Sequence, residues 1–205
     1  NIGASSGKDG PTHFCLEDIA LMRVLPRMTV VEPADGVEMK KAVRAIAEHV
    51  GPVYLRVGRV PIPVITRPDD EFVLGKANVV RRGQHVTVVA CGSMVSKAVA
   101  AAEELAAVGI EAEIINMHTI KPLDTDTLLK SVEKTGAVVT AEEHSAIGGL
   151  GSAVAEFLAC TRPVPLRIIG SPDKFGVCGT YEQIHQAFGL TAERIIQATK
   201  EVLKR

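Results

Sequence analysis

The pattern that most restricts the fold is an alternation between short β-branched runs and segments with helical periodicity. Apolar runs at residues 86–90, 114–117, 137–141 and 163–169 have the length of buried strands, and apolar stripes at helical spacing separate them. Strands joined by helices are typical of a parallel sheet that is covered on both faces. Residues 72–205 are therefore expected to form a compact, mostly parallel α/β domain.

The first third of the chain shows the same alternation once. A β-rich run at 28–33 precedes a helical segment that Asp35 is placed to cap, with Glu38 spaced as in a capping box, and a second strand is expected at 53–57. The buried face of this helix is expected to carry four apolar side chains at helical spacing: Met39, Val43, Ile46 and Val50. This strand–helix–strand unit predicts a small segment of parallel sheet.

A proline-rich and acidic stretch separates the two parts. Residues 60–71 contain three prolines followed by Asp69, Asp70 and Glu71, a composition that favours an extended, exposed linker. We therefore expect an α/β fold in which residues 1–66 form a partial parallel sheet and residues 67–71 link it to the larger domain.

Composition narrows the function classes. Hydrophobic residues make up 46% of the 205, aromatics only 3%, so the core must be aliphatic. A net charge of −1 without a basic stripe argues against nucleic acid and membrane surfaces as partners, and no apolar run approaches the ~18 residues of a membrane span. Four scattered cysteines, without a Cys-x-x-Cys pair, favour a reduced cytoplasmic setting over a zinc site, and no metal site is predicted.

The polar stretch that could bind a ligand is the loop at residues 7–13, Gly-Lys-Asp-Gly-Pro-Thr-His. It runs into a helical pattern that starts near Leu16, so we expect it at a helix N-terminus, where unpaired N–H groups favour anions and oxygen acceptors. Asp9 and His13 could hydrogen-bond a polyhydroxylated or phosphorylated ligand there. The structural alternative is a Gly-Pro turn in which the aspartate satisfies backbone donors.

Arg56 interrupts an otherwise apolar strand. It is either a structural ion pair or a charge delivered to a site at the C-terminal end of that strand, where open α/β sheets bind ligands. A guanidinium suits a phosphate or a carboxylate. Arg59 follows Gly58, and we interpret it as part of a solvated loop.

Two further motifs are interpreted as structural. The glycine-rich run at 148–151 follows a strand and opens a helix, but it lacks the dinucleotide fingerprint, so it indicates close helix–sheet packing. Glu142-Glu143-His144 cannot converge on one metal, because neighbours in a strand point to opposite faces, and a partly exposed strand end is expected there.

Taken together, the motifs of nearly the whole chain resemble the C-terminal section of the transketolase family. The loop at 7–13 resembles the family's Gly-Glu-Asp-Gly-Pro-Thr-His loop, and the order and spacing of the other motifs agree with it. These motifs lie at residues 16–20, 31–35, 55–56, 120–124, 142–144, 148–151 and 188–190.

The resemblance implies a role for each candidate residue. Residues 1–66 would be the second half of the pyrimidine-binding domain and residues 72–205 the C-terminal domain, which supports a homodimer in the family. Asp9 and His13 would contact the hydroxyls and carbonyl oxygen of the donor sugar, with His13 as the catalytic residue among them. Arg56 would hold the sugar phosphate.

The resemblance also shows what this stretch of sequence lacks. The family's diphosphate and magnesium motif is not in it, nor are the glutamate and the aromatic ring that hold the cofactor's aminopyrimidine. Asn1 stands where a further phosphate-binding histidine is expected. The chain is therefore expected to be a fragment or one subunit of a transketolase, which needs an N-terminal section, thiamine diphosphate and Mg²⁺ to transfer a two-carbon unit between sugar phosphates. Alone it is expected to bind no thiamine diphosphate tightly.

Three other interpretations stay open on the sequence. The last third also resembles the beta subunit of 2-oxoacid dehydrogenases and 1-deoxyxylulose-5-phosphate synthase, although the Ile-Lys-Pro-Leu-Asp turn at 120–124 favours transketolase. The third interpretation is a purely structural dimerisation module, for which the aliphatic core is sufficient.

Overall fold

The computed structural model describes residue 3 and residues 7–204, so Asn1 lies outside the described residues. The first part contains, in chain order, the short 3₁₀ helices η1 (Gly7–Asp9) and η2 (Pro11–His13), α1 (Asp18–Val24), β1 (Thr29–Val31), α2 (Gly36–Glu48) and β2 (Val53–Leu55). It is followed by β3 (Asn78–Arg81), β4 (Val86–Ala90), α3 (Met94–Ala106), β5 (Ala112–Asn116), β6 (Thr119–Lys121), α4 (Thr125–Thr135), β7 (Val138–Ser145), α5 (Leu150–Thr161), β8 (Leu166–Ser171), α6 (Tyr181–Phe188) and α7 (Ala192–Leu203).

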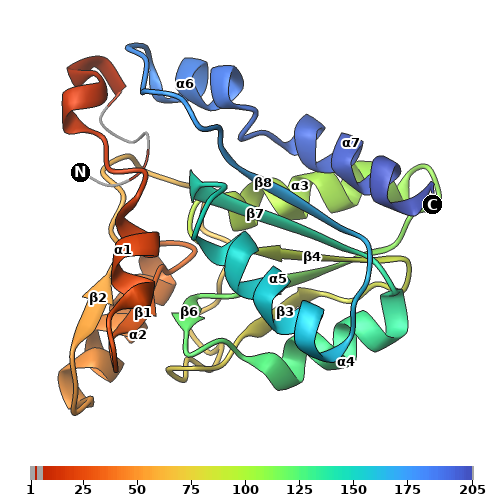
Figure 1. Ribbon diagram of the computed structural model, residues 1–205, viewed down its shortest axis with the longest axis horizontal. Coiled ribbons are helices and arrows are strands. Elements are labelled where there is room, and N and C mark those ends of the chain that lie inside the picture. Colours follow the sequence, from red (N-terminus) through yellow and green to blue (C-terminus); the bar gives the residue numbers. More distant parts are fainter. Residues whose placement is uncertain (1–2, 4–6, 205) are drawn as a thin grey trace.

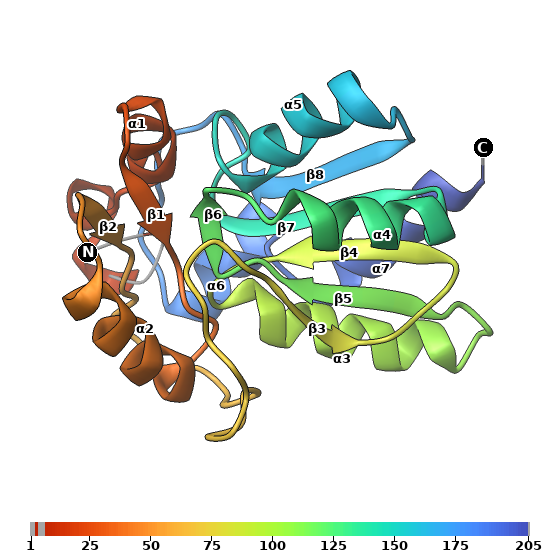
Figure 2. The ribbon, with the colours of Figure 1, turned by 90° about the horizontal axis from the view of Figure 1, so that it is seen from below.

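The larger sheet has the strand order β3-β5-β4-β7-β8. Its four neighbouring strands β5, β4, β7 and β8 are parallel, and β3 is added antiparallel at one edge. Helices α3 and α7 pack on one face, and α4 and α5 pack on the other (Figures 1 and 2). The predicted α/β class with mostly parallel strands is confirmed.

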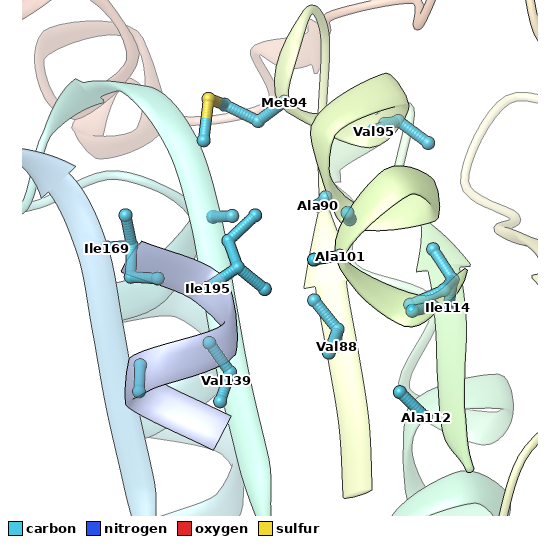
Figure 3. Close-up of a cluster of buried hydrophobic side chains, with 14 of the residues drawn as sticks. Val88, Ala90, Met94, Val95, Ala101, Ala112, Ile114, Val139, Ile169 and Ile195 are labelled. Atoms are coloured by element: carbon cyan, nitrogen blue, oxygen red, sulfur yellow. The ribbon is translucent and has the colours of Figure 1, made fainter. Parts of the chain in front are cut away.

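Alternation along the central strands supplies both halves of the core. Val88 and Ala90 of β4 face α3 and α7, whereas Val89 belongs to the cluster beneath α4 and α5. Figure 3 shows the first cluster, in which Ala101 of α3 and Ile195 of α7 lie against the strands. All five residues are fully buried. Small and branched side chains let the helices approach closely without aromatic rings, as the aliphatic composition predicted.

The smaller sheet has the order β2-β1-β6. Its strands β1 and β2 are parallel, and β6 pairs antiparallel with β1. The sequence predicts a turn over residues 119–124, but residues 119–121 form β6, which ties the second part of the chain to the first. Residues 67–71 contain no helix or strand. The division of the chain into domains at this stretch stays a prediction.

Asp35 caps helix α2 as predicted, but Glu38 binds the N–H of Ala34 and not that of Asp35 as a capping box requires, and the helix buries a different face from the expected one. The Asp35 carboxylate accepts hydrogen bonds from the N–H groups of Val37 and Glu38, at 2.9 and 3.0 Å. The Glu38 carboxylate accepts from Ala34 N and from the Asn116 amide, which turns that edge of the helix inward. The expected apolar stripe is therefore wrong in part. Val43 is 50% exposed and Val50 94% exposed.

The C-terminal ends of β4 and β7 point toward the first part of the chain (Figure 1). They therefore meet the segment that carries α1, β1 and the loop after β2. Among the described residues, no helix combines the length and apolar character that crossing a bilayer requires.

Candidate functional site

The loop at residues 7–13 folds as two consecutive 3₁₀ turns. Gly7 and Gly10 have φ of +53° and +81°, and a Cβ on Gly10 would lie 2.7 Å from Cys178 Sγ, so glycine is required at position 10. Helix α1 starts only at Asp18. The expectation that the loop lies at a helix N-terminus is therefore wrong, because residues 14–17 separate the two and the helix dipole acts only over its first turn.

Asp9 and His13 are both exposed on this loop. The Asp9 carboxylate forms an ion pair of 2.5 Å with the guanidinium of Arg59, and the two side chains are 42% and 57% exposed. His13 Nδ1 lies 3.0 Å from the Thr12 hydroxyl. The sequence predicts Arg59 to be merely solvated. It is exposed, but it is also the cation that contacts the loop.

Arg56 lies in a buried ion-pair network. Its Nε and Nη2 donate to the two carboxylate oxygens of Asp18, at 2.7 and 3.1 Å, and its Nη1 donates to Glu32 at 2.6 Å. Two backbone carbonyls, of Cys15 and Glu143, also accept from Nη2 at 3.3 Å. Its side chain is 0% exposed.

The role of Arg56 as the residue that holds the sugar phosphate stays a prediction. In this structure protein acceptors enclose the guanidinium of Arg56, as in the structural alternative considered from the sequence. The electrostatics of the network agree with a structural role. Burial by itself raises the pKa of Asp18, but the hydrogen bonds and charge of Arg56 outweigh burial and hold that pKa below its ordinary value. Asp18 also accepts a hydrogen bond from Tyr54 Oη at 2.8 Å.

The run Glu142-Glu143-His144 lies within β7 and not at a partly exposed strand end. All three residues are buried. As predicted from strand alternation, they do not converge. Glu142 and His144 lie on one side, 3.7 Å apart, whereas Glu143 accepts from Ser93 Oγ at 2.6 Å on the other. His144 accepts from Ala20 N and donates from Nδ1 to Ser145 O. Burial and the charge of Arg56 keep the pKa of His144 below its usual value, against the effect of the hydrogen bond to Ser145.

The glycine-rich run at 148–151 packs helix α5 onto the sheet, as predicted. The Glu142 carboxylate accepts from the N–H groups of Leu150 and Gly151 at the start of α5, at 2.6 and 2.8 Å. Burial raises the pKa of Glu142 to about 8, against the effect of these two hydrogen bonds. A Cβ on Gly149 would lie 1.9 Å from Glu142 Oε2. The run is therefore a close-packing element between helix and strand.

Two family models match the chain. The model of the transketolase pyrimidine binding domain matches residues 2–63, and the model of the transketolase C-terminal domain matches residues 75–195. The chain belongs to the transketolase family. This confirms the resemblance of the sequence to the C-terminal section of transketolase, together with part of its pyrimidine-binding domain.

Two relatives in this transketolase family are described as subunits. The chain is 49% identical to the 6-deoxy-6-sulfo-D-fructose transketolase subunit SqwH of Clostridium sp. (strain MSTE9), over 99% of this chain and 63% of that protein. It is 42% identical to a subunit of the apulose-4-phosphate transketolase of Phocaeicola vulgatus, over 99% of this chain and 65% of that protein. A solved structure described as a split gene transketolase, inactive beta4 tetramer, superposes with a TM-score of 0.89 at 44% identity, over 95% of this chain and 63% of that chain.

The transketolase chain described here thus spans less than two thirds of each of these proteins. The family implies thiamine diphosphate in the complete enzyme. Among the described residues, no group of three or more His, Cys, Asp or Glu side chains could hold a metal ion.

The residue that sequence reasoning missed is Arg59. No periodicity reveals it, because residues 56–60 form no regular element after β2. The sequence feature that could have pointed to Arg59 is its position three residues after Arg56, beyond the C-terminal end of a parallel strand, where ligands bind in such sheets. A lone arginine in an apolar strand is the more unusual feature, so the pattern points to Arg56 first.

Proposed function

We propose that this chain is the second-subunit portion of a two-subunit transketolase, and that the enzyme transfers a two-carbon ketol unit between sugars that carry an anionic tail. The observation that carries the proposal is the ion pair between Arg59 and Asp9, on the loop that also holds His13. It supplies an exposed cation next to the two loop residues of the family motif.

In this proposal Arg59 replaces Arg56 as the anion-binding residue. Arg59 is 57% exposed and its partner is a surface carboxylate, so exchanging that partner for a ligand anion costs little, because exposed ion pairs contribute about 0–1 kcal/mol. Releasing Arg56 would instead leave Asp18 and Glu32 as unpaired buried charges. A planar guanidinium can bind either a phosphate or a sulfonate group through two parallel hydrogen bonds.

Asp9 and His13 are proposed to position the donor sugar. Displaced from Arg59, the Asp9 carboxylate accepts hydrogen bonds from sugar hydroxyl groups. His13, which we propose as the catalytic residue of the loop, donates from its imidazole to oxygens near the carbonyl carbon and so stabilises charge there. Holding both ends of one ketose also fixes its orientation for the reaction.

The remaining parts of the enzyme follow from the same proposal. Thiamine diphosphate and Mg²⁺ are held by polypeptide other than the described residues, and the partner is an N-terminal transketolase subunit or section. Relatives named for a sulfonated and a phosphorylated sugar support an anionic tail as the shared substrate feature. A homodimeric association through the C-terminal part stays a prediction.

The test compares three donors that differ only at the tail: fructose 6-phosphate, 6-deoxy-6-sulfofructose and fructose. In the enzyme assembled with its partner, Arg59→Met should raise KM for the two anionic ketoses roughly tenfold to a hundredfold, because a hydrogen bond to a charged group contributes about 1.5–3 kcal/mol. KM for fructose should change less than about twofold. Arg162→Met, at an exposed arginine after α5, is the matched control.

Two results would overturn the proposal. An equal effect of Arg59→Met on all three ketoses would remove Arg59 from anion binding. Transfer from none of the ketoses, together with decarboxylation of pyruvate, would place the chain in a 2-oxoacid-converting enzyme.

A further inference from the structure

The 7–13 loop, which carries Asp9 and His13, packs against a segment from the far end of the chain. Residues 172–180 follow β8 and precede α6, and they form no helix or strand. Figure 1 shows this blue segment beside the red turns η1 and η2. The placement of the loop on the protein therefore depends on residues from the second part of the chain.

Two glycines of the 7–13 loop meet the 172–180 segment directly. A Cβ on Gly10 would lie 2.7 Å from Cys178 Sγ, and a Cβ on Gly7 would lie 3.3 Å from the carbonyl oxygen of Gly179. Both loop glycines have positive φ, so they also supply a backbone conformation that other residues rarely adopt. At these two positions the loop presents only its backbone to the segment.

Gly176 makes the reciprocal contact from the 172–180 segment. A Cβ on Gly176 would lie 2.5 Å from Phe14 Cδ2 and 2.9 Å from Pro11 Cβ. Its φ is outside the left-handed region, so the lack of space, and not the backbone conformation, requires glycine here. The Phe14 ring packs against the larger core cluster, and Pro11 Cβ belongs to a ring that is closed onto the backbone. Neither group can yield without moving the loop.

The other contacts of the loop shape it but do not place it. Its turns are closed by local hydrogen bonds, from His13 N to Gly10 O at 3.0 Å and from Gly10 N to Gly7 O at 3.2 Å. The ion pair between Asp9 and Arg59 is exposed and contributes little to stability. The close packing on the 172–180 segment is therefore the contact that fixes the position of the loop.

We infer that Gly176 and Cys178 are positioning residues for the donor sugar. They act through His13 and Asp9, because each contacts the residue that follows one of these two in the chain. Their packing fixes where the two polar side chains lie relative to Arg59. This inference rests on the proposed function, and it gives the second part of the chain a role in substrate recognition in addition to assembly.

The variant Gly176→Ala tests the packing at its closest point. The added Cβ would displace Phe14 by roughly 1 Å, which is the shift needed to reach an ordinary carbon–carbon distance. A misplacement of this size near reacting groups lowers rates by up to about a hundredfold. Since Gly176 acts through His13, which is proposed to stabilise charge near the reacting carbon, most of the loss should be in kcat.

The kinetic experiment uses the enzyme assembled with its partner and the same three donors: fructose 6-phosphate, 6-deoxy-6-sulfofructose and fructose. Gly176→Ala should lower kcat/KM tenfold to a hundredfold for all three alike, because the loop contacts the part of the sugar that they share. This pattern differs from that of Arg59→Met, which should raise KM only for the two anionic donors.

Two glycine variants separate loss of positioning from loss of stability. Gly149→Ala also forces a Cβ into a close contact, 1.9 Å from Glu142, but at the start of α5. It should destabilise the protein and leave kcat/KM of the folded enzyme within twofold of the wild type. Gly36→Ala meets no atom within 4 Å and should change neither quantity.

Cys178→Leu tests the second contact, because it adds bulk against the backbone of Gly10. It should lower kcat/KM at least fivefold for all three donors. Cys160→Leu is the matched control at another exposed cysteine, on α5, and should change kcat/KM less than twofold.

Hydrogen exchange followed by mass spectrometry measures the packing without reference to activity. In peptides that cover residues 7–14, the amides of Gly10 and His13 should exchange at least fivefold faster in Gly176→Ala than in the wild type. Gly149→Ala should leave this exchange unchanged.

The possible results separate the inference from the proposed function. Wild-type kcat/KM in both Gly176→Ala and Cys178→Leu, whether or not the loop amides exchange faster, would overturn the inference alone. An effect confined to the anionic donors would also overturn it, because it would place the two residues at the tail of the sugar. Transfer from none of the three ketoses by the wild-type enzyme would refute the proposed function and, with it, this inference.

Discussion

Replacing Arg56 by methionine should destabilise the protein far more than it changes substrate recognition. The substitution keeps an unbranched apolar stem but leaves Asp18 and Glu32, at 3% and 4% exposure, without a counter-charge. Removing one partner of a buried ion pair costs about 3–5 kcal/mol, because the remaining charge stays desolvated. For a chain of this length, that loss corresponds to a decrease of roughly 6–20 °C in Tm.

Urea unfolding measures the loss directly, through a lower midpoint at an unchanged slope. Arg59→Met is the matched control, because its ion pair with Asp9 is exposed and should contribute less than about 1 kcal/mol. Neutralising the unpaired carboxylates in the triple variant Asp18→Asn, Glu32→Gln, Arg56→Met should recover a large part of the loss.

The loss should also depend on pH. In the native protein Arg56 holds the pKa of Asp18 below its ordinary value of 3.8, so this stabilisation is complete above that pH and disappears below it. The deficit of Arg56→Met should accordingly shrink as pH falls toward 4, where the unpaired carboxylates take up protons. An Arg56→Met protein within 1 kcal/mol of the wild type, with KM raised only for anionic sugars, would refute the structural role.

Further predictions concern His118 and Gly149. Burial lowers the pKa of His118, which stacks on Phe72, to about 4. The contribution of neutral His118 to the free energy of unfolding is therefore complete above pH 6.5, and about 3 kcal/mol of it is lost as the pH falls from 6.5 to 4. The variant His118→Phe should lack this part of the pH dependence. An unchanged pH profile would show that His118 does not titrate as inferred. Gly149→Ala forces a Cβ against Glu142 and should cost about 1–3 kcal/mol in urea unfolding, whereas Gly36→Ala should be neutral or slightly stabilising. Equal stabilities of the two alanine variants would contradict the close-packing role of Gly149.

Local chemistry was sufficient to predict much of the architecture. The cap at Asp35 holds the start of α2 as expected, and Asp124 caps α4 in the same way by accepting from Thr127 N at 3.2 Å. The apolar runs became the buried strands, and their order indicated the parallel sheet. These features depend on residues a few positions apart, so the sequence alone contains the interactions that decide them.

The candidate site was less predictable, because its interactions join distant segments. Arg56 pairs with residues 38 and 24 positions away, and Asp9 pairs with a residue 50 positions away. An arginine in an apolar strand has the same local pattern whether it is enclosed by carboxylates or reaches a ligand, and only the folded neighbours distinguish the two.

The sequence by itself determined the α/β class, the aliphatic core and the family, since periodicity, composition and ordered motifs are properties of the chain alone. Only the tertiary structure decided that Arg56 is buried, that Arg59 contacts the loop, and that β6 completes the smaller sheet. The physical reason is that charge pairing and strand pairing depend on which surfaces meet in space, and the enclosed environment of a charge determines whether it serves stability or binding.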